Sequence, residues 1–549
     1  MKNTLSIIAT CLLFSLLQLN CKRSPTDNIR VNVNTDIFNS PMLIRFVNAN
    51  ENSVDQPSNF TVKISGKDAA LVVSSDGSTN FNAVGGVLTL AINSKTNASV
   101  SAPINFTITA NITGFAPIVK TISLVNNEPV QYTFSALELA NPTDGTVITS
   151  NQTAVTNGIV NSTFEIITPK RAEMPESSTL TIPTGTQLLD KDGKAISASM
   201  LTTNIVFYGT GDQSSINAFP GGLEPKDVIG ADGNTIDGGV NFMTAGMLSI
   251  NMNAGGTEVK SFSKPIAAAV ELNANQDNFA TGQPIKEGDS IPVWSMDETT
   301  GQWKYESQAI VTNVGGKLKA NFNITHLSGW NLDWGWSSFG GYNSCNSQLK
   351  VKTLTTVQGG NYEVTLTTPN GNYLGALHGT TIFNGFIANF TRTPVIANAK
   401  IVISDNNDGG KVVAESPLFN PCTKGSLDII VPGKPATDYV NVVVKTQGVC
   451  SKQKVNANIG VWMYLNKIGS NNWFVGFYNS PNNIGSLVLE NNSTYRLYAI
   501  YGNKLYFADI PLNKNNFTFP NISGLSGTAN YNSSTNTLTI NGTFVLPGC

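Results

Sequence analysis

The chain has 549 residues and a formal net charge of -2, and 13% of its residues are Asp, Glu, Lys or Arg. An average soluble domain has roughly 25% of these residues, so Asn, Ser, Thr and Gly supply much of the polar surface here. The length is too great for one hydrophobic core and predicts several domains of about 100–200 residues each. The balanced charge provides no basic field, so we expect no nucleic-acid partner.

The N-terminal segment has the pattern of an export signal. An apolar run, Leu5–Leu19, is too short for a membrane-spanning helix, which needs about 20 apolar residues. Cys21 follows this run and resembles the lipidation site of bacterial lipoproteins, especially those of Bacteroidota. Gln18 and Asn20 depart from the usual residues of that site. The alternative is an ordinary signal peptide cut elsewhere, although the run ends without an Ala-x-Ala-like site.

The resemblance to lipoproteins implies a cellular location for the whole chain. Residues 1–20 would be removed as a signal peptide, and Cys21 would carry the lipid. We therefore expect a membrane partner through the N-terminal lipid and a location in the cell envelope, with the outer membrane as the expected site. Whether the anchor faces the periplasm or the outside stays open.

The first predicted domain consists of short strands separated by turns. Segments such as Phe60–Ile64 and Val87–Ile92 mix apolar and polar residues at a period near two, and Asn, Asp and Gly separate them. A helical period is not sustained. The pattern is typical of a β-sandwich.

The middle of the chain carries three motifs with a shared resemblance. Ile182–Thr186 reads Ile-Pro-Thr-Gly-Thr, Trp294–Trp303 encloses a turn between two tryptophans, and His326–Asn331 reads His-Leu-Ser-Gly-Trp-Asn. These three motifs resemble those of extracellular ZU5-related β-domains, including the domains of the cartilage intermediate layer protein group. The resemblance covers roughly a third of the chain. It implies a β-sandwich used for display or interaction, with no catalytic residues to transfer.

The predicted fold class is therefore all-β, with several β-sandwich domains, Ig-like or ZU5-like, in tandem after a lipoprotein signal peptide. The expected boundaries are a signal peptide at 1–20, a tether at 21–38, a β-sandwich at 39–140, a ZU5-like β region at 145–338, a β-sandwich at 342–432 and a C-terminal β-sandwich at 436–549.

Four cysteines follow the proposed lipidation site, and they are disulfide candidates: Cys345, Cys422, Cys450 and Cys549. An even number suits an oxidising compartment. Three connectivities are possible, and local pairing within successive domains favours Cys345–Cys422 and Cys450–Cys549. None of the four forms a Cys-x-x-Cys motif, so we expect neither zinc nor thiol-redox chemistry.

The supply of catalytic side chains is small. Only two histidines are present, His326 and His378, and we expect the first to pack at a strand end and the second to lie in a loop. A pair of carboxylates for glycoside hydrolysis could come from Asp297, Glu298 and Asp333. The alternative is that these acids are solvated turn residues. We predict no catalytic residue and no cofactor.

One string has the spacing of a calcium loop. In Ser404–Glu415, Asn406, Asp408 and Glu415 fall at ligand positions and Gly409 at the required glycine. The first ligand position holds serine instead of aspartate, and the flanking segments have the pattern of strands, not helices. A hairpin turn made of Asn, Asp and Gly therefore explains this segment better than a calcium loop does. We predict no metal site, and a calcium ion near Asp408 is the alternative left open.

Five of the seven tryptophans lie between residues 294 and 336. We expect Trp294 and Trp303 to pair across a hairpin and Trp330 to fill the core. Trp334 and Trp336 come next to a glycine-rich stretch and are the ligand-contact candidates, because exposed aromatic rings anchor interfaces and stack on sugars.

The predicted function is a lipid-anchored cell-envelope protein that acts as a structural or interaction module without catalytic activity. A glycan or a protein is the possible partner. Two alternatives follow from the same residues: a glycan-binding surface lipoprotein in polysaccharide capture, and a glycosidase-like enzyme.

Overall fold

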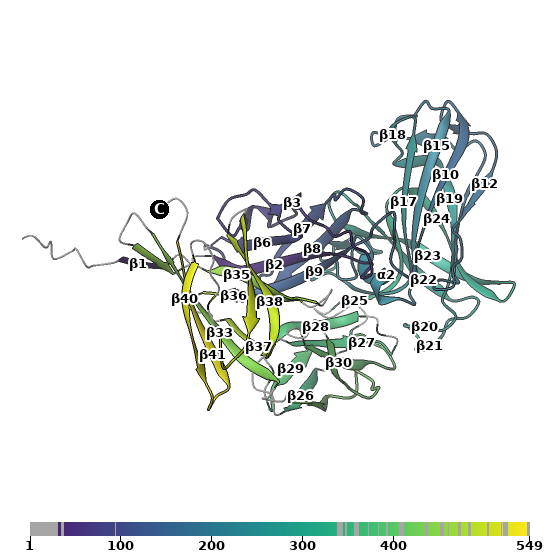
Figure 1. Cartoon of the computed structure of the whole chain (residues 1–549). Coiled ribbons are helices and arrows are strands. Elements are labelled where there is room, and N and C mark those ends of the chain that lie inside the picture. The colour runs from purple at the N-terminus through teal and green to yellow at the C-terminus, as the bar shows by residue number, and fades with distance from the viewer. Residues whose placement is uncertain are drawn as a thin grey trace, which may run out of the picture.

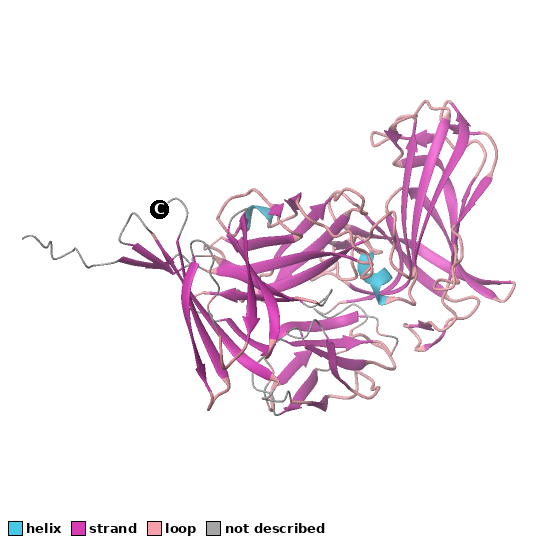
Figure 2. Cartoon of the chain, viewed as in Figure 1, coloured by secondary structure: helices cyan, strands magenta, loops and turns pink. Residues whose placement is uncertain are grey.

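The structure, a computed structural model, describes most of the chain after residue 30. The described residues are 31–34, 38–93, 95–337, 344–345, 348–355, 362–369, 371, 373–380, 382, 384–390, 393–405, 411–433, 438–450, 455–458, 460–469, 474–480, 485–501, 504–517, 519 and 525–545. Strands make up nearly all of the regular secondary structure in this part, and the helices in it are η1 (Ala69–Leu71) and α2 (Gln213–Ala218) (Figure 2). The predicted all-β fold class is confirmed.

The first domain consists of two four-stranded sheets. Its strands are β2 (Asn39–Asn48), β3 (Phe60–Ser65), β4 (Val72–Ser74), β5 (Asn82–Ala83), β6 (Val87–Ile92), β7 (Ile104–Ala110), β8 (Ile118–Leu124) and β9 (Val130–Ala136). One sheet has the order β4-β6-β2-β9 and the other the order β5-β3-β7-β8. Ile44 and Leu88 of the first sheet share one buried core with Phe106 and Ile108 of the second, which makes the pair a sandwich.

The second region is built around one 14-stranded sheet. Its strands are β10 (Thr146–Thr156), β11 (Ile159–Val160), β12 (Phe164–Ile167), β13 (Ser178–Ile182), β14 (Leu188–Leu189), β15 (Met200–Tyr208), β16 (Val228–Ile229), β17 (Asn241–Ala254), β18 (Thr257–Glu258), β19 (Ser261–Glu271), β22 (Ser290–Met296), β23 (Trp303–Val314), β24 (Lys317–His326) and β25 (Gly329–Trp336). The main path runs β11-β10-β15-β17-β25-β22-β23-β24-β19-β13-β12, and a small hairpin, β20 (Asp277–Asn278) and β21 (Gln283–Pro284), stands apart from it.

Both halves of this long sheet contribute to one core. Ile205 and Ile250 come from strands near one end of the path, and Leu180 and Ile324 come from strands near the other, yet all four belong to the same buried cluster. The sheet therefore curls until its halves face each other, as the right-handed twist of strands allows. β25 lies in the middle of the path, and every one of its residues is buried.

The third group of strands makes a sandwich of three and four strands. Its strands are β26 (Leu349–Thr355), β27 (Tyr362–Thr367), β28 (Tyr373–Thr380), β29 (Ile387–Phe390), β30 (Lys400–Asp405), β31 (Lys411–Glu415) and β32 (Ser426–Val431). The sheet orders are β29-β26-β32 and β28-β27-β30-β31. A disulfide joins Cys345 to Cys422, with the Cα atoms 5.3 Å apart, and this predicted pairing is confirmed.

The last group of strands also forms two sheets, and one of them recruits a strand from the beginning of the chain. The strands are β1 (Val31–Asn34), β33 (Tyr439–Val449), β34 (Val455–Asn458), β35 (Val461–Lys467), β36 (Phe474–Asn479), β37 (Gly485–Glu490), β38 (Ser493–Tyr501), β39 (Lys504–Leu512), β40 (Leu525–Asn532) and β41 (Thr537–Val545). One sheet has the order β36-β35-β38-β39, and the other runs β1-β34-β33-β41-β40, with β37 beside β33. Part of the expected tether, 21–38, is thus a strand parallel to β34.

Apolar clusters connect the first domain to two others. The first apolar junction is the buried cluster that joins Ala116 and Val119 of the first domain to Phe219 and Trp303 of the second region. A second apolar junction joins Leu43 and Val87 of the first domain to aromatic residues of the last sandwich. Figure 1 shows β1 and the last sandwich at one end of the molecule and β10, β12 and β15 at the other.

Candidate functional site

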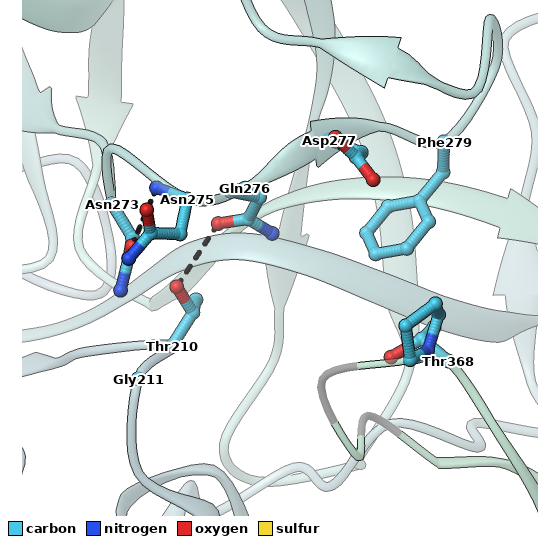
Figure 3. A pocket seen from close by; sticks show the side chains of 9 residues that line it. Thr210, Gly211, Asn273, Asn275, Gln276, Asp277, Phe279 and Thr368 are labelled. Atoms are coloured by element: carbon cyan, nitrogen blue, oxygen red, sulfur yellow. Dashed lines mark hydrogen bonds between the residues drawn. The ribbon is translucent and has the colours of Figure 1, made fainter.

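The candidate site is a hollow where the second region meets the third domain, which is the sandwich of β26 to β32 (Figure 3). Its volume is about 250 Å³. Three loops that follow strands β15, β19 and β27 supply its walls, so residues far apart in sequence meet there. We call it the amide hollow and define it by its lining: Thr210, Gly211, Asn273, Asn275, Gln276, Asp277, Phe279, Thr368 and Pro369.

Gln276 holds two of these loops together. Its Oε1 accepts a hydrogen bond of 3.0 Å from Thr210 Oγ1, and its Nε2 donates to the backbone carbonyl of Thr244 in β17. The residue is 6% exposed, so these bonds satisfy a largely buried amide. Gln276 thereby fixes the loop after β19 against the loop after β15.

Asn273 shapes the same loop from within. Its Oδ1 accepts a hydrogen bond of 2.9 Å from the backbone N–H of Asn275, and its carbonyl oxygen accepts one of 3.1 Å from the N–H of Gln276. Such an Asx turn is a common use of asparagine in loops. Among the described residues, neither Asn273 Nδ2 nor the Asp277 carboxylate has a hydrogen-bond partner, so both remain able to contact a ligand.

A second hollow adjoins the amide hollow and shares Gly211, Asn273 and Asn275 with it. Its volume is about 320 Å³, and it adds the acidic residues Glu173, Glu176 and Asp212. Asp212 caps α2 by accepting hydrogen bonds from the N–H groups of two following serines. Gly145, at the back of this hollow, has a φ of +71°, and a Cβ there would lie 2.5 Å from Asp212 Cβ, so the position needs glycine.

The ligand-contact candidates Trp334 and Trp336 do not line a surface. They are 5% and 2% exposed, and the expectation that they form an exposed contact site is wrong. The reason is that β25 is an inner strand with both faces covered. Trp334 instead supports the hollow from behind, since its ring packs edge-on against Phe279 at 5.5 Å.

Trp294, Trp303 and Trp330 lie in the core. Trp330 is 2% exposed in the main cluster, as predicted. Trp294 and Trp303 do not pair directly, because the strand register places Trp294 opposite Tyr305, with the rings 5.5 Å apart. The hairpin closes with Met296 opposite Trp303, so Trp294 lies two positions further along its strand. Both indole rings contact Phe242 of β17, one from β22 and the other from β23.

The structure does not bring the carboxylate candidates into one cleft. Asp333 is fully buried on β25, and burial raises its pKa to about 7, against the lowering effect of the neighbouring Thr244 and Asn331 side chains. Asp297 is an exposed turn residue whose Oδ1 accepts hydrogen bonds from two backbone N–H groups. The β22–β25 register separates the two acids by about five residues along the strand, or ~17 Å. Glycosidase pairs lie roughly 5–10 Å apart.

Glu298 and the two histidines give no catalytic arrangement either. Burial raises the pKa of Glu298, and the nearby carboxylate of Glu258 adds to the rise. His326 ends β24, and its ring lies 5.0 Å from that of Trp330, with Nε2 3.3 Å from Glu306 Oε1. It is therefore the packed strand-end residue that the sequence predicts. His378 lies in β28 and not in a loop, which corrects that expectation.

Several predicted positions fall outside the described residues, namely Cys21, Asp408 and Cys549. Cys450 is disulfide-bonded, and its expected partner is Cys549. The strands that flank Asp408 pair as a hairpin, with Asp405 opposite Lys411, which is the arrangement expected for a turn. Within the described ranges, no group of three or more His, Cys, Asp or Glu residues could hold a metal ion. No helix in those ranges has the length and hydropathy of a membrane span.

Sequence reasoning missed the residues of the amide hollow. The available signal was the polar run Asn273–Asn278 directly after an apolar strand. This run is one of many Asn-rich loops in the chain, and only the tertiary contacts with the loops after β15 and β27 distinguish it.

Comparisons with known proteins return distant likenesses. No family model matches the chain, and no curated protein is significantly similar to it. One similar structure is the minor pilin GBS52 of Streptococcus agalactiae, with 12% identity over 37% of this chain and 98% of the pilin, at a TM-score of 0.12. The Bacillus anthracis TIE protein has 10% identity over 68% of this chain and 74% of its own, at a TM-score of 0.13.

The major pilin subunit BcpA of Bacillus cereus is a further structure of this kind. It has 8% identity over 91% of this chain and 98% of its own, at a TM-score of 0.12. At these TM-scores the likenesses carry no argument about function, so the case for this chain depends on its own residues.

Proposed function

We propose that this chain is a lipid-anchored protein of the bacterial cell envelope that acts as a rigid structural and interaction module. The lipid is attached at Cys21, the compartment is oxidising, and the β-domains hold the interaction site away from the membrane. The disulfide between Cys345 and Cys422 supports the oxidising compartment.

The observation that carries this proposal is the sharing of buried cores between domains. Val119 of the first domain packs with Phe219 and Trp303 of the second region, and the Val119 N–H donates to the Pro220 carbonyl at 3.1 Å. On the other side, the Arg45 guanidinium lies 4.3 Å from the ring centre of Phe474 in the last sandwich. Domains joined in this way act as one body, whereas domains on flexible linkers move independently.

The position of β1 gives the proposed module an orientation. Val31 lies ten residues after the proposed lipid site, a distance of at most ~35 Å along the chain. Its strand pairs with β34 of the last sandwich. We therefore place the last sandwich next to the membrane and strands β10, β12 and β15 of the second region at the far end (Figure 1).

The resemblance of the second region to ZU5-related domains belongs to the same proposal. Its three motifs lie at the end of β13, in the β22–β23 hairpin and in the β24–β25 hairpin, and these strands belong to one sheet. This placement supports the motifs as structural elements of a single domain. It adds a display role to the second region and assigns no chemistry to it.

A glycan-binding role is the alternative that a specific observation favours. The amide hollow presents carboxamide, hydroxyl and aromatic side chains together, which is the mixture that recognises polar uncharged ligands. Asp333 is buried on β25, away from Asp297 and Glu298, which are consecutive residues after β22, so the enzyme alternative has no comparable support.

The anchoring half of the proposal is tested by comparing the full chain with Cys21→Ser in a bacterium that lipidates exported proteins. We expect the original chain in the membrane fraction, with an acylated Cys21 as its first residue by mass spectrometry, and the variant in the soluble fraction. A mature N-terminus at any other residue would contradict the proposal. Pull-down from intact cells with both forms then identifies a co-purifying polysaccharide or envelope protein.

The rigidity half is tested by small-angle X-ray scattering of the purified full chain. A single compact particle with the dimensions of the structure is expected. A scattering curve typical of independently moving domains would contradict the shared cores.

A further inference from the structure

We propose that the amide hollow binds a neutral saccharide, with sugar hydroxyl groups held by Asn273 and Asp277 and an apolar sugar face against Phe279. This inference deepens the proposed function, because it names the ligand class of the interaction module and rests on that function for its setting. It has its own test on the purified chain, which does not depend on anchoring.

The polar atoms of the hollow match the hydrogen-bonding needs of a sugar. A sugar hydroxyl is both a donor and an acceptor. Asn273 Nδ2 is a donor and the Asp277 carboxylate is an acceptor, and in the described part of the chain both lack protein partners. In Figure 3 these two residues lie on the same wall of the hollow, on either side of Gln276. A hydroxyl-rich ligand could therefore satisfy both at once.

Apolar side chains adjoin this wall. Phe279 lines the hollow at 9% exposure, and the Pro369 ring lines it from the third domain. Sugar rings carry C–H groups on their faces that pack on aromatic rings, while their hydroxyls point outward. The hollow thus offers polar and apolar side chains side by side, as sugar recognition requires.

The charge of the lining decides between ligand classes. Asp277 lines the amide hollow, and Glu173, Glu176 and Asp212 line the adjoining one. The described lining of both hollows contains no lysine and no arginine. Carboxylates repel phosphates, sulfates and uronic acids, which discriminates against anionic ligands. Within the amide hollow, three carboxamides and two hydroxyls accompany one carboxylate, which favours a neutral sugar unit there, whereas the adjoining hollow is acidic.

The size suits an oligosaccharide. Ligand sites commonly measure about 300–1,000 Å³, and the two hollows have volumes of about 250 and 320 Å³ with three lining residues in common. Either hollow alone is near the lower limit, and together they fall within the range. Gly211 lies in the wall that they share, where a side chain would narrow the passage between them.

The lining is held in place before a ligand arrives. Gln276 is hydrogen-bonded to Thr210 and to the backbone of β17. Asn273 is held by its Asx turn, and the Phe279 ring packs against Trp334. A wall that is already ordered loses little conformational entropy on binding, so even a few hydrogen bonds yield measurable affinity.

The test is titration calorimetry of the purified full-length chain with three sets of oligosaccharides. The neutral set contains glucan, mannan, xylan and galactan fragments, the anionic set oligogalacturonates and the cationic set chitosan fragments. We expect binding within the neutral set, weakened about tenfold in Asp277→Ala by the loss of a hydrogen bond to a charged group. We expect no detectable binding in Gly211→Leu, which fills the shared wall.

Asp55→Ala, an exposed carboxylate of the first domain, is the matched control and should bind like the original chain. Asp277→Asn keeps the shape of the side chain and replaces Asp277→Ala if the latter does not fold. The proposal is overturned if no neutral oligosaccharide binds, if only the anionic or cationic set binds, or if neutral binding is unchanged in both hollow variants. None of these results affects membrane attachment through Cys21, so failure here is distinguishable from failure of the anchoring proposal.

Discussion

The second region shares a buried apolar cluster with each of its two neighbours, but only one of the two contacts also contains a polar hollow. Against the first domain it presents the first apolar junction, where Trp303 is 1% exposed and lies 5.0 Å from Phe242 and 6.0 Å from Phe219. With the third domain it shares its main buried cluster, which includes Leu366 and Leu374, and the same contact also contains the amide hollow, with polar side chains and free volume. The difference teaches that one sheet can serve rigidity at one contact, through burial of apolar area, and recognition at another, through polar groups left open to a ligand.

The largest expected effect is on the first apolar junction. Trp303→Ala should lower the free energy of unfolding by about 3–5 kcal/mol, because it removes a large buried ring and leaves a cavity. Chemical denaturation followed by fluorescence measures the loss, with Trp303→Phe as the milder control. A loss below about 1 kcal/mol would mean that the junction does not depend on apolar packing.

The buried acid on β25 gives the next effect, and it depends on pH. Burial raises the folded-state pKa of Asp333 from 3.8 to about 7, so its contribution to stability is complete below about pH 3.8 and is lost as the pH rises through 7. Asp333→Asn should remove this loss and stabilise the chain, relative to the original, by up to ~4 kcal/mol at pH 8.

Urea denaturation of both forms between about pH 5 and pH 8 measures this prediction. The difference between Asp333→Asn and the original chain should grow with pH across that window. A constant difference would contradict the raised pKa. Asp297→Asn, at an exposed turn of the same region, is the matched control.

A lysine beside the first apolar junction should make stability depend on pH in the opposite sense to Asp333. Lys120 donates a hydrogen bond of 2.7 Å to the Phe219 carbonyl, and burial lowers its pKa from 10.5 to about 7. The pKa of Lys120 is lower in the folded state than in the unfolded state. The free energy of unfolding is therefore highest, with respect to this group, above about pH 10.5, and it decreases as the pH falls toward 7.

Lys120→Met should therefore flatten the pH dependence between about pH 10 and pH 7. We expect a gain of about 1–2 kcal/mol at pH 7, less than full burial implies, because the residue keeps part of its exposure. Thermal unfolding across this range measures it, with the exposed Lys63→Met as control. A variant with the original pH profile would show that the lysine is solvated.

The smallest effect on stability belongs to the amide hollow. Asp277→Ala should change the free energy of unfolding by no more than about 0.5 kcal/mol, because the carboxylate makes no hydrogen bond within the described chain and surface substitutions usually cost little. Thermal unfolding of this variant beside Trp303→Ala sharpens the contrast between the two contacts. A loss comparable to that of Trp303→Ala would make Asp277 a structural residue.

Sequence pattern was informative where local rules apply. Alternating apolar residues predicted the strands, and local pairing favoured the disulfide between Cys345 and Cys422, which the structure contains. His326 next to Trp330 also followed from its place at a strand end. In each case the outcome depends on neighbours close in sequence or within one domain, which a strand period and a turn signal describe.

Pattern was uninformative where residues meet across long loops. Trp334 and Trp336 lie beside a glycine-rich stretch and read as exposed, yet β25 is an inner strand, and no local feature reports how many strands flank it. The sequence around His378 predicts a loop, whereas the structure has His378 in strand β28. The amide hollow combines residues 210, 276 and 368, which only the contact of two domains brings together.

By itself the sequence determined an all-β chain, because strand periodicity, turn residues and scarce charge are local and compositional properties. The tertiary structure alone decided which tryptophans are buried, that the strand at 31–34 pairs with the last sandwich, and where a polar hollow opens. The physical reason is that burial and hydrogen-bond satisfaction depend on which surfaces meet, and that choice is made by packing between segments hundreds of residues apart.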